Sequence, residues 1–431
     1  MIPALTGFAV LLALVFLRMP IALAMGLVGF AGFGLLTGWT PSLAMTARLV
    51  VDTGQNYGLS VVPLFILMGN FVSRAGLSNE LYNASHAFLG HRRGGLAMAT
   101  VVACGAFSAI CGSSLATAAT MAKVALPPMR RFHYSDELAT ASIAAGGTLG
   151  ILIPPSVILV IYGLLTEQSI GALFAAGILP GLVGVLFYVG AVRFTVWRRP
   201  EAGPADAPMP WDLRWRALGG VWGTILLFIV VMGGIYGGVF TPTEAAGVGA
   251  GGAFVIALAR RTLTWLVLWQ VLVESARTTA MLFTVLIGAL IFSNFVNRAG
   301  LPDGLLALVT AFDVSPIVVI LLILAVYIVL GCVFESLSML LLTVPIFFPL
   351  VQNLGFDLIW FGIIVVVVTE ISLITPPVGL NVFVLAGVVP DVSTRTIFRG
   401  VTPFWIADIG RLLLLVFVPA LSLYLPRLMG H

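Results

Sequence analysis

The chain has 431 residues, of which 60% are hydrophobic and 9% charged, and its formal net charge is +4. Soluble domains carry about 25% charged residues. This composition and a mean hydropathy of +1.13 exclude an ordinary soluble domain and indicate a polytopic helical membrane protein. The positive charge does not indicate nucleic-acid binding, because the arginines lie in short loops, where they orient membrane helices.

The N-terminal part, residues 1–57, is predicted to supply scaffold helices. Residues 2–16 and 21–36 are apolar, whereas the more polar residues 38–57 are expected at the membrane interface or in a loop.

The first repeat is predicted over residues 58–197. A polar apex at 110–117 separates two apolar limbs of about 15 residues each, or about 22 Å as helix. Because this is shorter than a ~30 Å hydrocarbon core, we predict a re-entrant hairpin over 96–128. A helix capped by Ser135 should then break at Pro154-Pro155, which gives a broken helix over 136–165.

Residues 198–216 contain four prolines and four arginines and are predicted to be a cytoplasmic linker. Connecting scaffold helices should occupy 217–276, where Thr241 and Glu244 resemble helix-capping residues. The second repeat is predicted over 277–425, with a hairpin at 314–350 and a broken helix at 358–388.

Three landmarks support an internal duplication. The segment 70–77 recurs at 294–301 with an offset of 224, while Pro154-Pro155 recurs as Pro376-Pro377 and Pro127 as Pro349, both with an offset of 222. Arginines stand in the loops before and after the first hairpin, at 92–93 and 130–131, and the equivalent loops of the second hairpin have none. After the broken helices the bias reverses, because Arg395 and Arg399 follow the second one and no basic residue stands at 166–169 after the first. Because positive loops stay in the cytoplasm, the copies should be inverted. We predict an all-α polytopic membrane protein with an inverted-repeat ion-transporter-type fold, two re-entrant helical hairpins and two broken helices.

The four breaks are predicted to form one ion and substrate site. Broken backbone is tolerated in lipid only beside protein or a water-filled cavity, and unwound backbone and hydroxyls offer oxygens to a cation. The sodium ligands are expected among Ser113, Ser114, Gly147, Gly150, Pro154, Glu335, Ser336, Thr369, Ser372 and Thr375. The substrate contacts are expected at Gly112, Thr117, Ser338 and Asn381.

Simpler roles for these residues stay open. The serines and threonines would also cap hairpin limbs or pack helices. Glu335 and Glu370 are the only acids expected at mid-membrane depth, where a carboxylate is functional by default, but Glu335 would also suit a helix cap and Glu370 a structural hydrogen bond. No arginine or lysine is expected at the breaks, and no metal site other than sodium is expected.

Nothing in the sequence predicts an enzyme. No Walker-type phosphate loop is present, and no nucleophile is paired with a base in a pattern typical of membrane proteases.

The motifs VPLFILMGN (62–70), GSSLAT (112–117), GILIPPS (150–156), FTPTEAA (240–246) and ITPPVGLN (374–381) resemble the large membrane subunit of TRAP (tripartite ATP-independent periplasmic) transporters, the DctM type. The resemblance covers essentially the whole chain. It implies a multi-pass protein of the bacterial inner membrane that imports a small carboxylate, such as a dicarboxylate, a sugar acid or sialic acid, with sodium as the coupling ion and no cofactor.

The same resemblance implies two protein partners: a DctP-type periplasmic binding protein, which sets much of the substrate choice, and a DctQ-type four-helix membrane subunit as a separate chain. It also implies an elevator motion of the hairpin-bearing domain. Three alternatives stay open, namely a stand-alone sodium/carboxylate symporter, proton coupling through Glu335 or Glu370, and a rocking motion.

Overall fold

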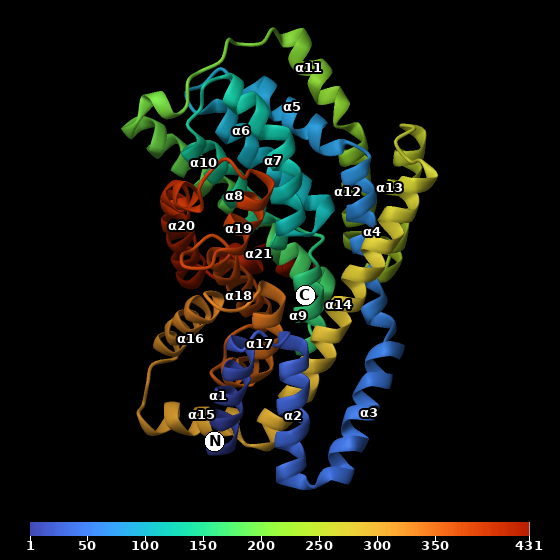
Figure 1. The fold of residues 1–431 in the computed structure, drawn as a ribbon, viewed down its shortest axis with the longest axis vertical. Coiled ribbons are helices and arrows are strands. Elements are labelled where there is room, and N and C mark those ends of the chain that lie inside the picture. Colours follow the sequence, from blue (N-terminus) through green and yellow to red (C-terminus); the bar gives the residue numbers. More distant parts are fainter. Residues whose placement is uncertain (431) are drawn as a thin grey trace.

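The protein was analysed as a computed structural model that describes residues 1–430, and the described part is helical throughout, without strands. It is elongated, and the hairpins of the two repeats lie in opposite halves of the molecule (Figure 1). At the N-terminal end, the amino group of Met1 donates to the carbonyl of Ala299 over 2.9 Å. The first helices are α1 (Ile2–Phe16), α2 (Ile21–Thr37) and α3 (Trp39–Gln55).

The duplication predicted from the sequence appears as two parallel series of helices. The first series follows η1 (Tyr57–Ser60) and contains α4 (Val61–Arg74), α5 (Leu77–Leu89), α6 (Gly95–Cys111), α7 (Ser114–Arg131), α8 (Asp136–Thr148), η2 (Leu149–Ile151), α9 (Val157–Thr166) and α10 (Ile170–Arg198). The second contains α14 (Trp265–Arg298), α15 (Leu301–Ala311), α16 (Pro316–Gly331), α17 (Ser336–Asn353), α18 (Leu358–Ser372), α19 (Leu380–Val388) and α20 (Thr394–Phe417). The series are joined by η3 (Pro200–Ala202), α11 (Trp211–Gly220), α12 (Trp222–Tyr236) and α13 (Pro242–Ala259), and α21 (Ala420–Leu428) follows them.

Helical hairpins and breaks form where the sequence predicts them. The pairs α6–α7 and α16–α17 turn sharply, and both Pro154-Pro155 and Pro376-Pro377 lie in non-helical backbone between shorter helices. Ser135 caps α8 by accepting from the Leu138 N–H, as predicted. The helices of the hairpins contain 16 to 18 residues. Their re-entrant insertion into a membrane stays a prediction.

Two helices differ from the expected division of the chain. Residues 39–55 form α3, so the loop alternative for this stretch is wrong, while its place at the membrane interface stays a prediction. The predicted boundary at residue 276 falls inside α14, which continues for 34 residues, or about 51 Å. This helix packs along α2 and α4 and reaches α17, so it belongs both to the connecting part and to the second repeat.

The beginning of the linker is docked onto the first repeat. The Tyr134 hydroxyl accepts from the Leu96 N–H and donates to the Pro204 carbonyl, over 3.1 and 2.9 Å. Burial raises the pKa of Tyr134 to about 12, so this donor stays protonated at neutral pH. His86 lies 2.9 Å from Asp206. The linker therefore ties the open end of the first hairpin to neighbouring loops.

Six helices in the described residues are long and apolar enough to cross a membrane, or seven if the bent pair α11–α12 counts as one span. The capping box predicted at Thr241 and Glu244 begins one of them, α13.

Candidate functional site

The two hairpin tips meet at one cavity of about 390 Å³. We call residues 112–114 the first tip and residues 332–336 the second tip. Gly112, Ser113 and Ser114 of the first tip and Glu335 and Ser336 of the second line the cavity together. Five of the fourteen predicted site residues, from opposite halves of the chain, therefore face the same space.

Local backbone chemistry fixes the first tip. Gly112 ends α6 with a φ of +65°, a left-handed conformation that favours glycine. Ser113 caps α7 by accepting from the Ala116 N–H over 3.4 Å. Gly150, just before the first break, lies so close that a Cβ there would come within 3.0 Å of the Ser113 carbonyl. The first tip thus rests directly on the first broken helix.

The second tip carries a carboxylate at the equivalent place. Glu335 is the residue that precedes α17, and the hydroxyls of Ser336 and Ser338 donate to its two oxygens over 3.4 Å each. These hydrogen bonds are long and come from neutral groups. Within residues 1–430, Glu335 forms no ion pair. The simpler role that the sequence left open, a carboxylate at a helix start, is present in the structure and is compatible with ion binding.

The repeat offset explains why these residues meet. Adding 222 to Ser113 gives Glu335, and adding 222 to Ser114 gives Ser336, so the tips occupy equivalent positions. Each begins the second limb of its hairpin, with the start of that helix at the cavity. The exposed N–H groups of a helix start favour anions, whereas hydroxyl and carboxylate oxygens favour cations.

A third wall of the cavity comes from residues that were not predicted as part of the site. Asn70 of α4 and Glu274 and Thr278 of α14 line it. Asn70 also donates to Ser275 over 2.8 Å, while Glu274 lies 3.5 Å from Arg74. Asn70 lies in the duplicated segment 70–77, and this duplication was the sequence signal that could have identified it as a site residue. Among the described residues that line the cavity, none is arginine or lysine.

The other predicted residues lie outside the cavity lining. Thr369, Ser372 and Thr375 donate their hydroxyls to carbonyls of their own helical turns, at 2.6 to 2.8 Å. The Ser338 hydroxyl donates to Glu335, and the Asn381 amide donates to the Ala144 carbonyl of α8 over 3.0 Å. Thr117 is buried without a hydrogen-bond partner for its hydroxyl, Gly147 lies against Ala118 of α7, and Pro154 is buried beside Gly177 of α10. Their sodium- and substrate-binding roles stay predictions.

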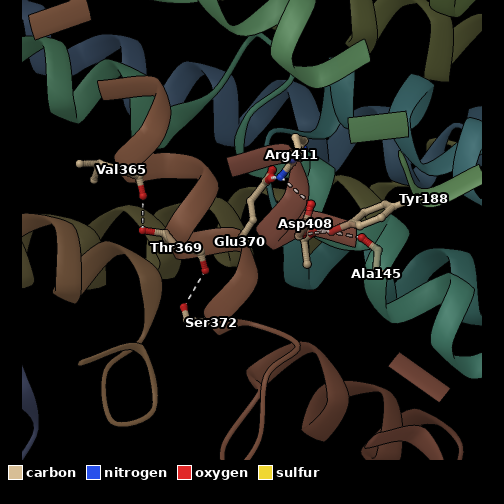
Figure 2. A network of polar contacts seen from close by, with 9 residues as sticks. Ala145, Tyr188, Val365, Thr369, Glu370, Ser372, Asp408 and Arg411 are labelled. Atoms are coloured by element: carbon tan, nitrogen blue, oxygen red, sulfur yellow. Dashed lines mark hydrogen bonds and ion pairs between the residues drawn. The ribbon is translucent and has the colours of Figure 1, made fainter. Parts of the chain in front are cut away.

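A second polar cluster lies between the two broken helices. Glu370 of α18 pairs with Arg411 of α20, which also lies 3.0 Å from Asp408, and all three side chains are completely buried. Tyr188 of α10 donates to Asp408 (Figure 2). The Tyr188 hydroxyl also lies 2.8 Å from that of Thr148 on α8. Thr148 and Glu370 are again separated by 222 residues. The cluster therefore joins equivalent positions of both repeats.

This cluster corrects two expectations. Asp408 is a completely buried acid that was not expected beside Glu335 and Glu370, and Arg411 is a buried cation paired with Glu370, two residues before the end of α18. The missed signal was an Asp and an Arg at i and i+3 inside the apolar segment 404–417. For Glu370, the geometry favours the structural role over a free ion ligand.

Comparison with known proteins agrees with this architecture. Residues 8–421 match the family model described as tripartite ATP-independent periplasmic transporter, DctM component. The chain is 37% identical over 391 residues to the C4-dicarboxylate TRAP transporter large permease protein DctM of Pseudomonas aeruginosa, covering 90% of this chain and 91% of that protein. It is 33% identical to the sialic acid TRAP transporter large permease protein SiaM of Vibrio cholerae, covering 97% of each. The fold is similar to that of the YdaH transporter of Alcanivorax borkumensis, with a TM-score of 0.64 and 16% identity over 89% of both chains.

Proposed function

The chain belongs to the DctM family of tripartite ATP-independent periplasmic transporters, and we propose that as their large permease subunit it uses a sodium gradient to import a small carboxylate. The observation that carries this proposal is the shared cavity of the two hairpin tips, with one unpaired carboxylate and several hydroxyls on its wall. Sodium binds oxygen ligands. A carboxylate inside a membrane that has no cationic side chain beside it is stabilised by a bound cation.

We place the coupling ion between Ser113, Ser114, Glu335 and Ser336. These side chains come from two separate hairpins, so an ion between them would hold the tips together. Loss of the ion would leave Glu335 with neutral partners only. Ion binding and the relative position of the tips would therefore be coupled.

The substrate carboxylate would be recognised without a basic side chain. The starts of α7 and α17 offer N–H groups at the cavity, and a bound sodium ion would neutralise Glu335. The volume of about 390 Å³ is within the usual range for small-ligand pockets. The relatives named for C4-dicarboxylate and for sialic acid support the carboxylate class. The choice of the individual compound would belong to the receptor.

The assembly would contain two further chains in the bacterial inner membrane and periplasm. A DctP-type binding protein would deliver the substrate, and a DctQ-type membrane subunit would bind the scaffold helices. The hairpins and broken helices pack against each other across the repeats, which supports their movement as one elevator unit against the rest.

The test is uptake by the full chain in liposomes together with its small subunit and receptor. Labelled substrate should accumulate under an inward sodium gradient and should fail to accumulate when potassium replaces sodium. A proton gradient without sodium, imposed separately, should not support uptake.

Omitting the receptor should abolish uptake, since a stand-alone symporter would continue without it. Sodium-independent uptake with every component present would refute the coupling. Uptake driven by the proton gradient alone would transfer the ion role from sodium to protons.

A further inference from the structure

A basic pocket lies where the end of α10 meets the beginnings of α8 and α20, and it shares no lining residue with the cavity at the hairpin tips. Its volume is about 500 Å³, and Arg198, Arg199 and Arg399 line it, together with Glu137 and Glu201. Arg199 is paired with Glu137 over 3.1 Å. Among residues 1–430, neither Arg198 nor Arg399 makes an ion pair, so two guanidinium groups are available to an anion.

The pocket opens into an apolar groove between α10 and α20. The groove measures about 580 Å³, and Leu186, Phe187, Ile406 and Ala407 form most of its walls. Phe194, Arg198, Thr402 and Pro403 line both spaces. At the junction, the Arg198 guanidinium lies 4.9 Å from the centre of the Phe194 ring. One continuous site thus has a basic end and an apolar end.

We infer that this site binds an anionic phospholipid, with the phosphate between Arg198 and Arg399 and an acyl chain in the groove between α10 and α20. Charge complementarity selects the head group, because arginine offers several N–H donors to phosphate oxygens. The apolar groove selects a lipid over a free anion, since a phosphate ion has nothing to place there. Basic pockets between membrane helices on the cytoplasmic side commonly bind such head groups.

The sequence supports the same side of the membrane. The linker after Arg198 and the loop before Arg399 were both predicted to be cytoplasmic from the distribution of arginines. The structure brings these two segments, about 200 positions apart in the chain, to one pocket. Trp197, next to Arg198, is 75% exposed, which is typical of a side chain at the membrane–water interface.

Gly190 provides a way to test the acyl end by itself. A Cβ at this position would meet no atom within 4 Å, so α10 can accept a larger side chain here without a clash. Such a side chain would occupy part of the groove. Arg193, one turn before Trp197, is exposed and does not line the pocket, so it is a matched control for removal of charge.

The experiment is native mass spectrometry of the full chain in detergent, titrated with phosphatidylglycerol or phosphatidylcholine of the same acyl composition. Phosphatidylglycerol should bind at least about tenfold more tightly. In R198Q/R399Q its affinity should fall about 30-fold, whereas R193Q should retain it. Gly190→Leu should weaken both lipids alike while all charges remain. Each variant is compared by size-exclusion profile.

Two further experiments test whether the site takes a free anion in place of a lipid and whether the small subunit covers it. Inorganic phosphate at millimolar concentration should not displace phosphatidylglycerol; if it displaces the lipid fully, the site takes a free anion and the inference fails. A photoreactive phosphatidylglycerol should label peptides of α10 and α20, also in the complex with the small subunit. Equal binding of both lipids, unchanged binding by R198Q/R399Q, or labelling abolished by the small subunit would overturn the inference.

Discussion

The two repeats share a backbone plan and differ in chemistry. At equivalent places, the first repeat has Ser113 and Thr148 where the second has Glu335 and Glu370. Both first-repeat residues are neutral hydroxyls, and both second-repeat residues are carboxylates. The carboxylates at the cavity and the buried charges of the polar cluster thus come from the second half of the chain.

This difference shows that two copies of one backbone plan can carry different chemical groups at equivalent positions. The first tip offers neutral oxygens and a glycine turn, while the second tip supplies a carboxylate, Glu335, which is the proposed cation ligand. Similarly, Thr148 only extends the cluster through Tyr188, whereas Glu370 holds the buried Arg411. Changes at equivalent positions should therefore have unequal effects.

The largest effect is expected for Arg411→Met. This change leaves Glu370 and Asp408 buried without their cation, and it should lower the free energy of unfolding by about 3–5 kcal/mol. Chemical unfolding in detergent measures this loss. Arg260→Met is the control, because Arg260 pairs with Glu80 where the two side chains are 21% and 30% exposed, and its loss should cost only about 1 kcal/mol. Equal losses in both variants would contradict the role of the cluster.

The next effect compares the tips directly. Glu335→Gln should weaken sodium binding by about 30- to 100-fold because a charged ligand is lost, and Ser113→Ala by about 3- to 10-fold. Sodium titration of uptake or of thermal stability measures both. Glu167→Gln, at an exposed loop acid, should leave the affinity unchanged. If Ser113→Ala weakened sodium binding more than Glu335→Gln, Glu335 of the second repeat would not be the main sodium ligand.

Tyr188→Phe should have a smaller effect on stability. It removes the hydroxyl between Thr148 and Asp408, which should cost about 1–3 kcal/mol because a buried carboxylate loses a donor. The midpoint of thermal unfolding reports the change, with the exposed Tyr424→Phe as the reference. A midpoint equal to that of the reference would mean that the bridge between the repeats carries no energy.

The smallest effect is expected for Thr148→Val, which keeps the side-chain shape. The Tyr188 hydroxyl would still donate to Asp408, so only about 1 kcal/mol should be lost. Thr310→Val is a suitable control, since the Thr310 hydroxyl donates to the Leu306 carbonyl at an exposed position, as the buried Thr148 hydroxyl donates to the Ala145 carbonyl. A loss as large as that of Arg411→Met would show that the repeats contribute equally.

Local signals in the sequence were sufficient for the hairpins and the breaks. Proline removes a backbone donor and a polar apex interrupts an apolar run, so these features mark helix ends wherever the chain goes. The recurrence of a polar apex and a double proline in both halves also predicted that Ser113 and Glu335 would belong to one site. The helices begin and end within a few residues of those predictions.

Only the tertiary structure decided which polar residues pair. Asp408 and Arg411 lie about 40 positions after Glu370, and Tyr188 lies 220 positions before Asp408, so no local pattern links them. Likewise, the hydroxyls of Thr369, Ser372 and Thr375 turn to their own helix, while the cavity wall takes Asn70, Glu274 and Thr278 instead. Helix breaks follow from covalent properties of the residues present, whereas the partner of a buried charge depends on which helix packs against it.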